Sequence, residues 1–161
     1  MAISYLALGS NLANPLRQIT TAIDELVQLH DLTVLQASSL YQNPSLISGQ
    51  PDYINAVIKI STALTPLELL EKCKFLEQTH QRVHYYHWGP RTLDIDILLY
   101  DNLVMQSEKL VIPHPQMHNR EFVLIPLLEI APQLILPNGE PLQQYLNQTH
   151  ETIGLEKIIS T

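Results

Sequence analysis

The chain has 161 residues, of which 45% are hydrophobic and 16% are charged, a balance typical of a globular domain. Its formal net charge of -7 disfavours nucleic acid bound by overall charge, and no apolar run approaches the ~20 residues that a membrane span needs. Cys73 is the only cysteine, which excludes an intramolecular disulfide and a Cys-based zinc site. We therefore predict a single domain over residues 1–161, located in the cytoplasm, without nucleic-acid or membrane partners.

The first part of the chain predicts a strand followed by a helix. Residues 2–8 are apolar, which predicts a short buried strand that Gly9-Ser10-Asn11 ends. Asn14 and Pro15 are typical of an N-cap and a first helical residue. The apolar residues that recur at helical spacing predict the buried face of this helix: Leu16, Ile19, Ala22, Ile23 and Leu26.

The middle of the chain predicts two more strands and a second helix. A strand from Leu32 to Tyr41 is followed by a loop from Asn43 to Gln50. In residues 53–62, every second residue from Ile54 to Ile60 is isoleucine or alanine, which predicts a strand with these residues buried on one face. Thr65-Pro66-Leu67-Glu68 is a capping box with proline at the first helical position. The inward residues of the helix that it starts are predicted to be Leu69, Leu70, Cys73 and Leu76.

The last part of the chain completes a recognisable order of elements. A fourth strand is predicted from Leu93 to Tyr100, and a helix from Arg120 to Ile130 that Pro126 interrupts. The tail after Pro137 is compatible with one short helix. Strand, helix, strand, strand, helix, strand is the split βαβ pattern of ferredoxin-like folds, in the α+β class. We therefore predict a four-stranded antiparallel core sheet with helices packed on one face and ligand loops on the other.

Two carboxylates in the fourth predicted strand indicate a metal site. Asp94 and Asp96 lie two residues apart, so both side chains point to one face, where they repel each other unless a cation lies between them. Oxygen ligands suit Mg²⁺. An exposed polar face of an edge strand is the alternative, and it is the better interpretation of this pair alone. Guanidinium groups at Arg82, Arg91 and Arg120 shift the balance towards a pocket for metal and polyphosphate.

A second pair of side chains suits a flat heterocycle. Tyr53 and Asn55 share the face of their strand opposite the isoleucines. The Asn55 amide offers a donor and an acceptor, which match the amide-like edge of a pterin or a purine. Tyr53 and Phe122 can stack on the two faces of such a ring. The alternative to a heterocycle site is an ordinary polar sheet face that includes one aromatic residue.

Histidine spacing leaves a zinc site as another alternative. Five of the seven histidines fall between His80 and His118, and His80 and His84 lie one turn apart if the second helix continues. Trp88-Gly89-Pro90 ends any helix close by, and no Cys or Glu completes a zinc motif. The alternative function is a zinc hydrolase built on His80, His84, His114 and His118.

The segment Trp88 to Ile97, WGPRTLDIDI, resembles the signature of the 6-hydroxymethyl-7,8-dihydropterin pyrophosphokinase family. Three more segments resemble this family: Tyr5 to Asn11 its opening strand, Gln50 to Ala56 its pterin-binding strand, and Pro113 to Pro132 its third helical segment. The resemblance implies a ferredoxin-like α+β fold and a monomer. It also implies transfer of pyrophosphate from ATP, the co-substrate, to the hydroxymethyl group of a dihydropterin in folate synthesis, with two Mg²⁺ ions.

The same resemblance implies roles for individual residues. Asp94 and Asp96 would hold the metal ions, and they would be catalytic together with Arg82 and Arg91. The implied ATP-binding residues are Leu70, Arg82, Trp88, Arg91, Ile97, Lys109, His114 and Arg120. The implied pterin-binding residues are Asn43, Pro44, Leu46, Tyr53, Asn55, Trp88 and Phe122.

Two departures from the family pattern lie near the implied ATP site. Residues 84–87, HYYH, stand where the family carries further arginines, so His84 and His87 are candidates for holding ATP in their place. Pro115 stands where a tyrosine is familiar. A non-catalytic module that binds a pterin or a nucleotide also stays open, because ferredoxin-like sheets often serve that purpose.

Overall fold

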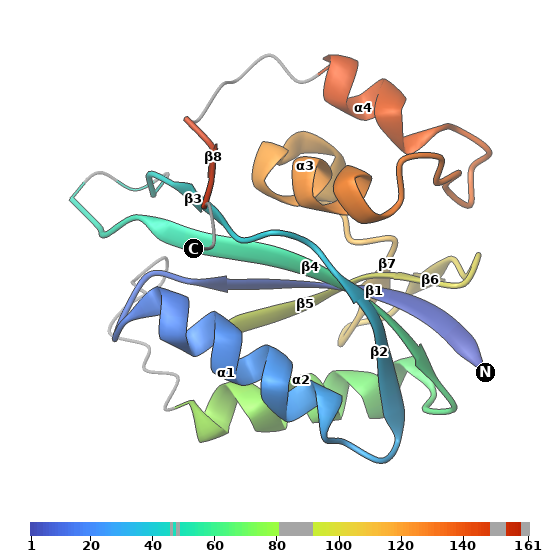
Figure 1. The fold of residues 1–161 in the computed structure, drawn as a ribbon. Coiled ribbons are helices and arrows are strands. Elements are labelled where there is room, and N and C mark those ends of the chain that lie inside the picture. Colours follow the sequence, from blue (N-terminus) through green and yellow to red (C-terminus); the bar gives the residue numbers. More distant parts are fainter. Residues whose placement is uncertain (46, 48, 81–91, 149–153, 159–161) are drawn as a thin grey trace.

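The computed structural model describes residues 1–45, 47, 49–80, 92–148 and 154–158 (Figure 1). Its strands are β1 (Ala2–Ser10), β2 (Leu32–Ala37), β3 (Tyr41–Asn43), β4 (Tyr53–Thr62), β5 (Asp94–Tyr100), β6 (Met105–Gln106), β7 (Val111–Ile112) and β8 (Glu156–Lys157). Its helices are α1 (Pro15–Val27), α2 (Pro66–Thr79), α3 (Glu121–Ile130) and α4 (Leu142–Gln148), with a short 3-10 turn η1 (Met117–Asn119).

Within this described part of the chain, six strands form one antiparallel sheet. The order is β5-β1-β4-β3-β8, and β2 also pairs with β4. The predicted α+β class and antiparallel core sheet are confirmed. The sheet is larger than the predicted four strands, because β8 adds to β3 and because the predicted strand from Leu32 to Tyr41 is two strands. The break lies at Ser38, whose side-chain oxygen accepts the Val57 N–H at 2.9 Å and so replaces a ladder carbonyl.

Helices α1 and α2 cover one face of the sheet, as predicted (Figure 1). The Asn14 side chain caps α1, and both hydrogen bonds of the Thr65–Glu68 capping box start α2. The prediction that Leu16 faces inward from α1 is wrong, since Leu16 is 43% exposed and the buried face of the helix begins at Ile19. The core on this side consists mainly of aliphatic residues from both helices and from β1, β2, β4 and β5.

Helix α3 closes part of the opposite face, where ligand loops alone were predicted (Figure 1). Its residues Leu124 and Leu127 are fully buried in a second apolar cluster with Val57 of β4, so β4 is buried on both faces. The predicted interruption at Pro126 is wrong, because α3 runs through it. A proline inside a helix removes one backbone hydrogen bond, but tertiary packing supplies most of the stability of helices in proteins. The short helix predicted in the tail is confirmed as α4.

A carboxylate ties the end of α3 to the link between β2 and β3. Glu129 accepts hydrogen bonds from the Tyr41 hydroxyl at 2.6 Å and from the Ser39 hydroxyl at 2.7 Å, and the Ser39 N–H donates to it at 3.0 Å. Burial by itself would raise the pKa of Glu129, but these hydrogen bonds outweigh it and lower the pKa below its ordinary 4.5. The tie positions α3 over the sheet.

Replacing Glu129 with glutamine should therefore lower the free energy of unfolding at pH 7 by about 1 kcal/mol, after allowance for solvent screening. Because the folded-state pKa is lowered, this contribution is present above pH 4.5 and is lost as the pH falls through the lowered pKa. Urea unfolding at several pH values measures the difference. The exposed Glu108→Gln is the matched control, and an equal effect of both variants would contradict the tie.

Candidate active site

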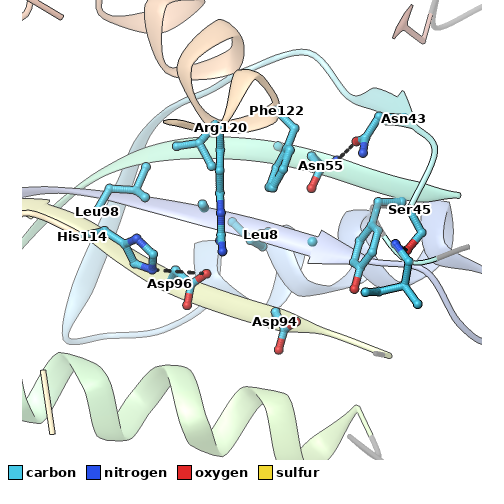
Figure 2. Close-up of a pocket in the computed structure, with 16 residues that line it drawn as sticks. Leu8, Asn43, Ser45, Asn55, Asp94, Asp96, Leu98, His114, Arg120 and Phe122 are labelled. Carbon is cyan, nitrogen blue, oxygen red and sulfur yellow. Dashed lines mark hydrogen bonds and ion pairs between the residues drawn. The ribbon is translucent and has the colours of Figure 1, made fainter. Parts of the chain in front are cut away.

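A cavity of about 430 Å³ lies between the sheet and the start of α3 (Figure 2). This volume is in the range of small-molecule sites, ~300–1,000 Å³. Side chains that carry charge, amide groups or aromatic rings converge on it from β3, β4, β5, the segment before η1 and the start of α3. They are Asn43, Tyr53, Asn55, Asp94, Asp96, His114, Arg120 and Phe122.

One row of the sheet forms the floor of this cavity. Gly9 of β1 pairs with Asn55 of β4 on one side and with Asp94 of β5 on the other. Residues directly opposite each other point to the same face, so the amide and the carboxylate both face the cavity across Gly9. A Cβ atom at residue 9 would lie 3.2 Å from Asn55 Oδ1. Glycine therefore keeps the floor open.

The two aspartates form an acidic wall along β5. Asp94 and Asp96 line the cavity, whereas Ile95 between them is buried in the core on the other face. The buried Glu77 of α2 accepts a hydrogen bond from the Ile95 N–H at 2.9 Å. Since β5 lies at the edge of the sheet, this bond fixes the backbone between the two aspartates. The sequence assigned no role to Glu77, because a contact between elements leaves no periodic signal.

His114 stands beside the acidic wall (Figure 2). Its Nε2 lies 3.9 Å from Asp96 Oδ2, too far for a hydrogen bond. Burial lowers the pKa of His114 below its ordinary 6.5; Asp96 opposes this effect and Arg120 adds to it. Because Nδ1 accepts the Gln116 N–H at 3.1 Å, the neutral ring carries its proton on Nε2, which faces Asp96.

Arg120 and Phe122 enter the cavity from the start of α3 (Figure 2). The Arg120 guanidinium carbon lies 5.6 Å from the centroid of the Phe122 ring, a cation–π contact. The contact holds a positive group above an otherwise acidic wall. A bound anion at this position would meet the guanidinium fork of Arg120.

The structure gathers most of the described residues that the sequence singled out for a site. All eight side chains named above for the cavity were candidates, and the cavity also contains Ile47, which sequence reasoning missed. Of the other candidates, Ile97 is buried in the core on the far face of β5, Leu70 packs against that core, and Lys109 is exposed near β7. The Pro44 carbonyl contacts Asn43 without lining the cavity. The candidates that lie outside the described residues are Leu46, Arg82, His84, His87, Trp88 and Arg91.

The histidines proposed for zinc do not come together where the structure describes them. His80 contacts Gln18 and Glu25 of α1, whereas His118 packs its ring 5.6 Å from that of Tyr145. His114 lies in the cavity, apart from both. Among the described residues, no group of three or more His, Cys, Asp or Glu could hold a metal. The zinc-hydrolase alternative is therefore not favoured.

The fold and the cavity define an α+β protein whose site combines aromatic, amide, acidic and basic groups for a small molecule. Residues 5–132 match the model of the 7,8-dihydro-6-hydroxymethylpterin-pyrophosphokinase (HPPK) family, and the chain belongs to this family. It is 47% identical over 158 residues to the 2-amino-4-hydroxy-6-hydroxymethyldihydropteridine pyrophosphokinase of Haemophilus influenzae, covering 96% of this chain and 99% of the relative. The enzyme of the same name from Pseudomonas aeruginosa is 42% identical, with 88% of each chain covered.

Solved structures share the fold at much lower sequence identity. The HPPK-DHPS protein of Plasmodium falciparum, solved with pterin and p-hydroxybenzoate, superposes with a TM-score of 0.74 at 16% identity. The match covers 98% of this chain but only 46% of that one, so this chain spans less than half of the longer protein. The described helices include none that is both long and apolar enough to cross a bilayer.

Proposed function

We propose that this chain transfers pyrophosphate from ATP to the hydroxymethyl group of 6-hydroxymethyl-7,8-dihydropterin, releasing AMP, as a step of folate biosynthesis. The observation that carries the proposal is the convergence of the predicted side chains on one cavity, within the segment that matches the HPPK family. Relatives that match over nearly their whole length bear the name of this activity. We further propose that the chain works as a single cytoplasmic domain and as a monomer.

The pterin half of the site comprises the aromatic and amide residues. Tyr53 and Phe122 would stack on the two faces of the ring, and aromatic faces supply large contact area at low entropy cost. Asn55 would pair with its amide-like edge. Asn43 and Pro44 lie next to this group, and a contribution from Leu46 rests on the family resemblance alone.

Asp94 and Asp96 would hold Mg²⁺ in the other half of the site. Mg²⁺ is typically bound by one or two carboxylates and completes its shell with water and substrate phosphates, so two aspartates facing a cavity fit it without a third protein ligand. When bound, the metal would neutralise charge on the phosphate oxygens and orient them. By family resemblance alone we propose two ions, and Ile97, Leu70 and Lys109 would lie on the ATP side.

The chain's own groups would then act by positioning and charge. Arg120 would bind phosphate oxygens by its guanidinium fork, and the Nε2–H of neutral His114 would donate to another oxygen. Arg82, Arg91 and Trp88 would join them by family resemblance. Phosphoryl-type transfer needs little covalent assistance, because alignment of the pterin hydroxyl with the β-phosphorus and neutralisation of charge together supply most of the acceleration.

One experiment tests the proposed function. Purified protein is mixed with ATP, Mg²⁺ and 6-hydroxymethyl-7,8-dihydropterin, and AMP and pterin diphosphate are measured by chromatography. Equal amounts of both products are expected, with no turnover when Mg²⁺ is removed. Binding of both ligands without AMP would instead support the non-catalytic module. Turnover that survives Mg²⁺ removal and depends on zinc would support the hydrolase.

The tail supplies a further prediction about the pterin half. β8 pairs with β3, which carries Asn43, and the Ile158 N–H donates to the Leu40 carbonyl at 2.8 Å. Ile158→Pro removes this donor and should weaken pterin binding by about 3- to 10-fold, with ATP binding unchanged. Calorimetry with each ligand measures both affinities. Ile158→Val keeps the N–H and should bind normally; equal losses in the two variants would contradict this role for the tail.

A further inference from the structure

Two buried amides and a backbone carbonyl form a chain of hydrogen bonds beside the cavity. Asn43 Nδ2 donates to the Pro44 carbonyl at 2.9 Å, and Asn55 Nδ2 donates to Asn43 Oδ1 (Figure 2). Only 2% of Asn43 and 5% of Asn55 are exposed, so water cannot readily substitute for these partners. Both side chains line the cavity.

This chain of hydrogen bonds has a fixed direction. A backbone carbonyl can only accept, so the Asn43 side chain must turn its NH₂ group towards Pro44 and its oxygen towards Asn55. The oxygen of Asn43 in turn accepts only from the NH₂ group of Asn55. Rotating either amide by 180° would place two donors or two acceptors against each other, at the cost of an unsatisfied buried group.

The direction decides which atom of Asn55 is left for a ligand. Asn55 Oδ1 lies on the side away from Asn43 and accepts no hydrogen bond from the described residues (Figure 2). It faces the floor at Gly9, where the missing side chain leaves the approach open. An acceptor oxygen in this position requires an N–H group on the bound molecule.

We propose that Asn43 is a positioning residue that holds the Asn55 carbonyl oxygen towards the cavity, so that the site selects heterocycles whose edge presents an N–H donor. The inference deepens the proposed function and rests on it. A pterin meets the requirement through its 2-amino group and its ring N3–H. A heterocycle with acceptors only along that edge does not.

The test compares three ligands on three proteins. The ligands are 6-hydroxymethylpterin, its analogue with oxygen in place of the 2-amino group, and its N3-methyl analogue. The proteins are wild type, Asn43→Leu and Asn43→Asp. Leucine has nearly the shape of asparagine but no polar atoms. Aspartic acid keeps an oxygen facing the Asn55 NH₂ group, and its protonated form, which burial favours, keeps a donor for the Pro44 carbonyl. Dissociation constants come from the fluorescence of the pteridines, and ATP affinity reports on the integrity of the fold.

Wild type should prefer the pterin over at least one analogue by roughly 10-fold, the effect of one well-made hydrogen bond. Asn43→Leu should lower this ratio by about 3- to 10-fold because the Asn55 amide can then turn either way. Asn43→Asp should keep the ratio, and ATP affinity should be the same in all three proteins. A purely structural role of Asn43 would change the affinity for all three ligands by one factor and leave the ratio unmoved.

Two results with the Asn43 variants would overturn the inference and leave the proposed function standing: a wild-type ratio that persists in Asn43→Leu, or a ratio lost equally in Asn43→Asp. Equal binding of all three ligands by wild type would also overturn it, and the proposed function would stand. If wild type bound none of the three, both the proposed function and the inference would fail.

Discussion

Asp96→Ala is expected to lower turnover by roughly 100-fold or more while the protein stays folded. The substitution removes a fixed oxygen ligand of Mg²⁺, and the charge neutralisation that such an ion provides is worth several kcal/mol in the transition state. Asp94→Ala should act in the same direction. Because both side chains face the cavity and not the core, the free energy of unfolding should change little. Steady-state kinetics at several Mg²⁺ concentrations measures the effect.

Asp24→Ala is the matched control for the loss of one negative charge. Asp24 is exposed on α1, which covers the opposite face of the sheet, so its loss should leave kinetics unchanged. Urea unfolding of all three variants separates a catalytic defect from a folding defect. A folded Asp96→Ala protein with near-normal turnover would contradict the two-metal proposal.

Tyr53→Ala and Phe122→Ala should each weaken pterin binding by about 1–3 kcal/mol, which corresponds to roughly 5- to 150-fold. The estimate follows from the stacking of bases on aromatic side chains, which depends on the ring face and not on its substituents. ATP affinity should change much less, because both residues are proposed for the pterin half. Isothermal calorimetry with each ligand gives the two affinities.

Phe75→Ala controls for the loss of a ring elsewhere. Phe75 is 62% exposed on α2, outside the cavity, and its removal should change neither affinity. If Tyr53→Ala or Phe122→Ala lost pterin and ATP equally, the rings would have a general structural role and the sandwich would be wrong.

Most helices and strands could be predicted from residues that lie close together in the sequence. The capping box at Thr65 and the N-cap at Asn14 involve residues three apart, so their hydrogen bonds could be predicted from spacing alone. The misjudged elements depend on distant partners. The strand break at Ser38 requires the Val57 N–H, and the continuity of α3 through Pro126 requires the apolar cluster beneath it.

The features of the site also divide into those that depend on neighbouring residues and those that depend on distant ones. The sequence by itself determined that Asp94 and Asp96 share one face of a strand and that Tyr53 and Asn55 share one face of another, because side chains in a strand alternate with a period of two. Only the tertiary structure decided that these two faces meet, since β1 lies between β4 and β5 and Gly9 pairs with Asn55 and Asp94 at once.

The hydrogen bonds that hold the site residues in place could not be predicted from the sequence. Glu77 reaches Ile95 across 18 positions, and Asn55 reaches Asn43 across 12. Both separations far exceed the three or four positions over which helical spacing makes a side-chain contact predictable, because each bond joins two elements whose relative position is set by core packing. The sequence therefore determined which chemical groups the protein can use, and the packing of the elements decided which way those groups point.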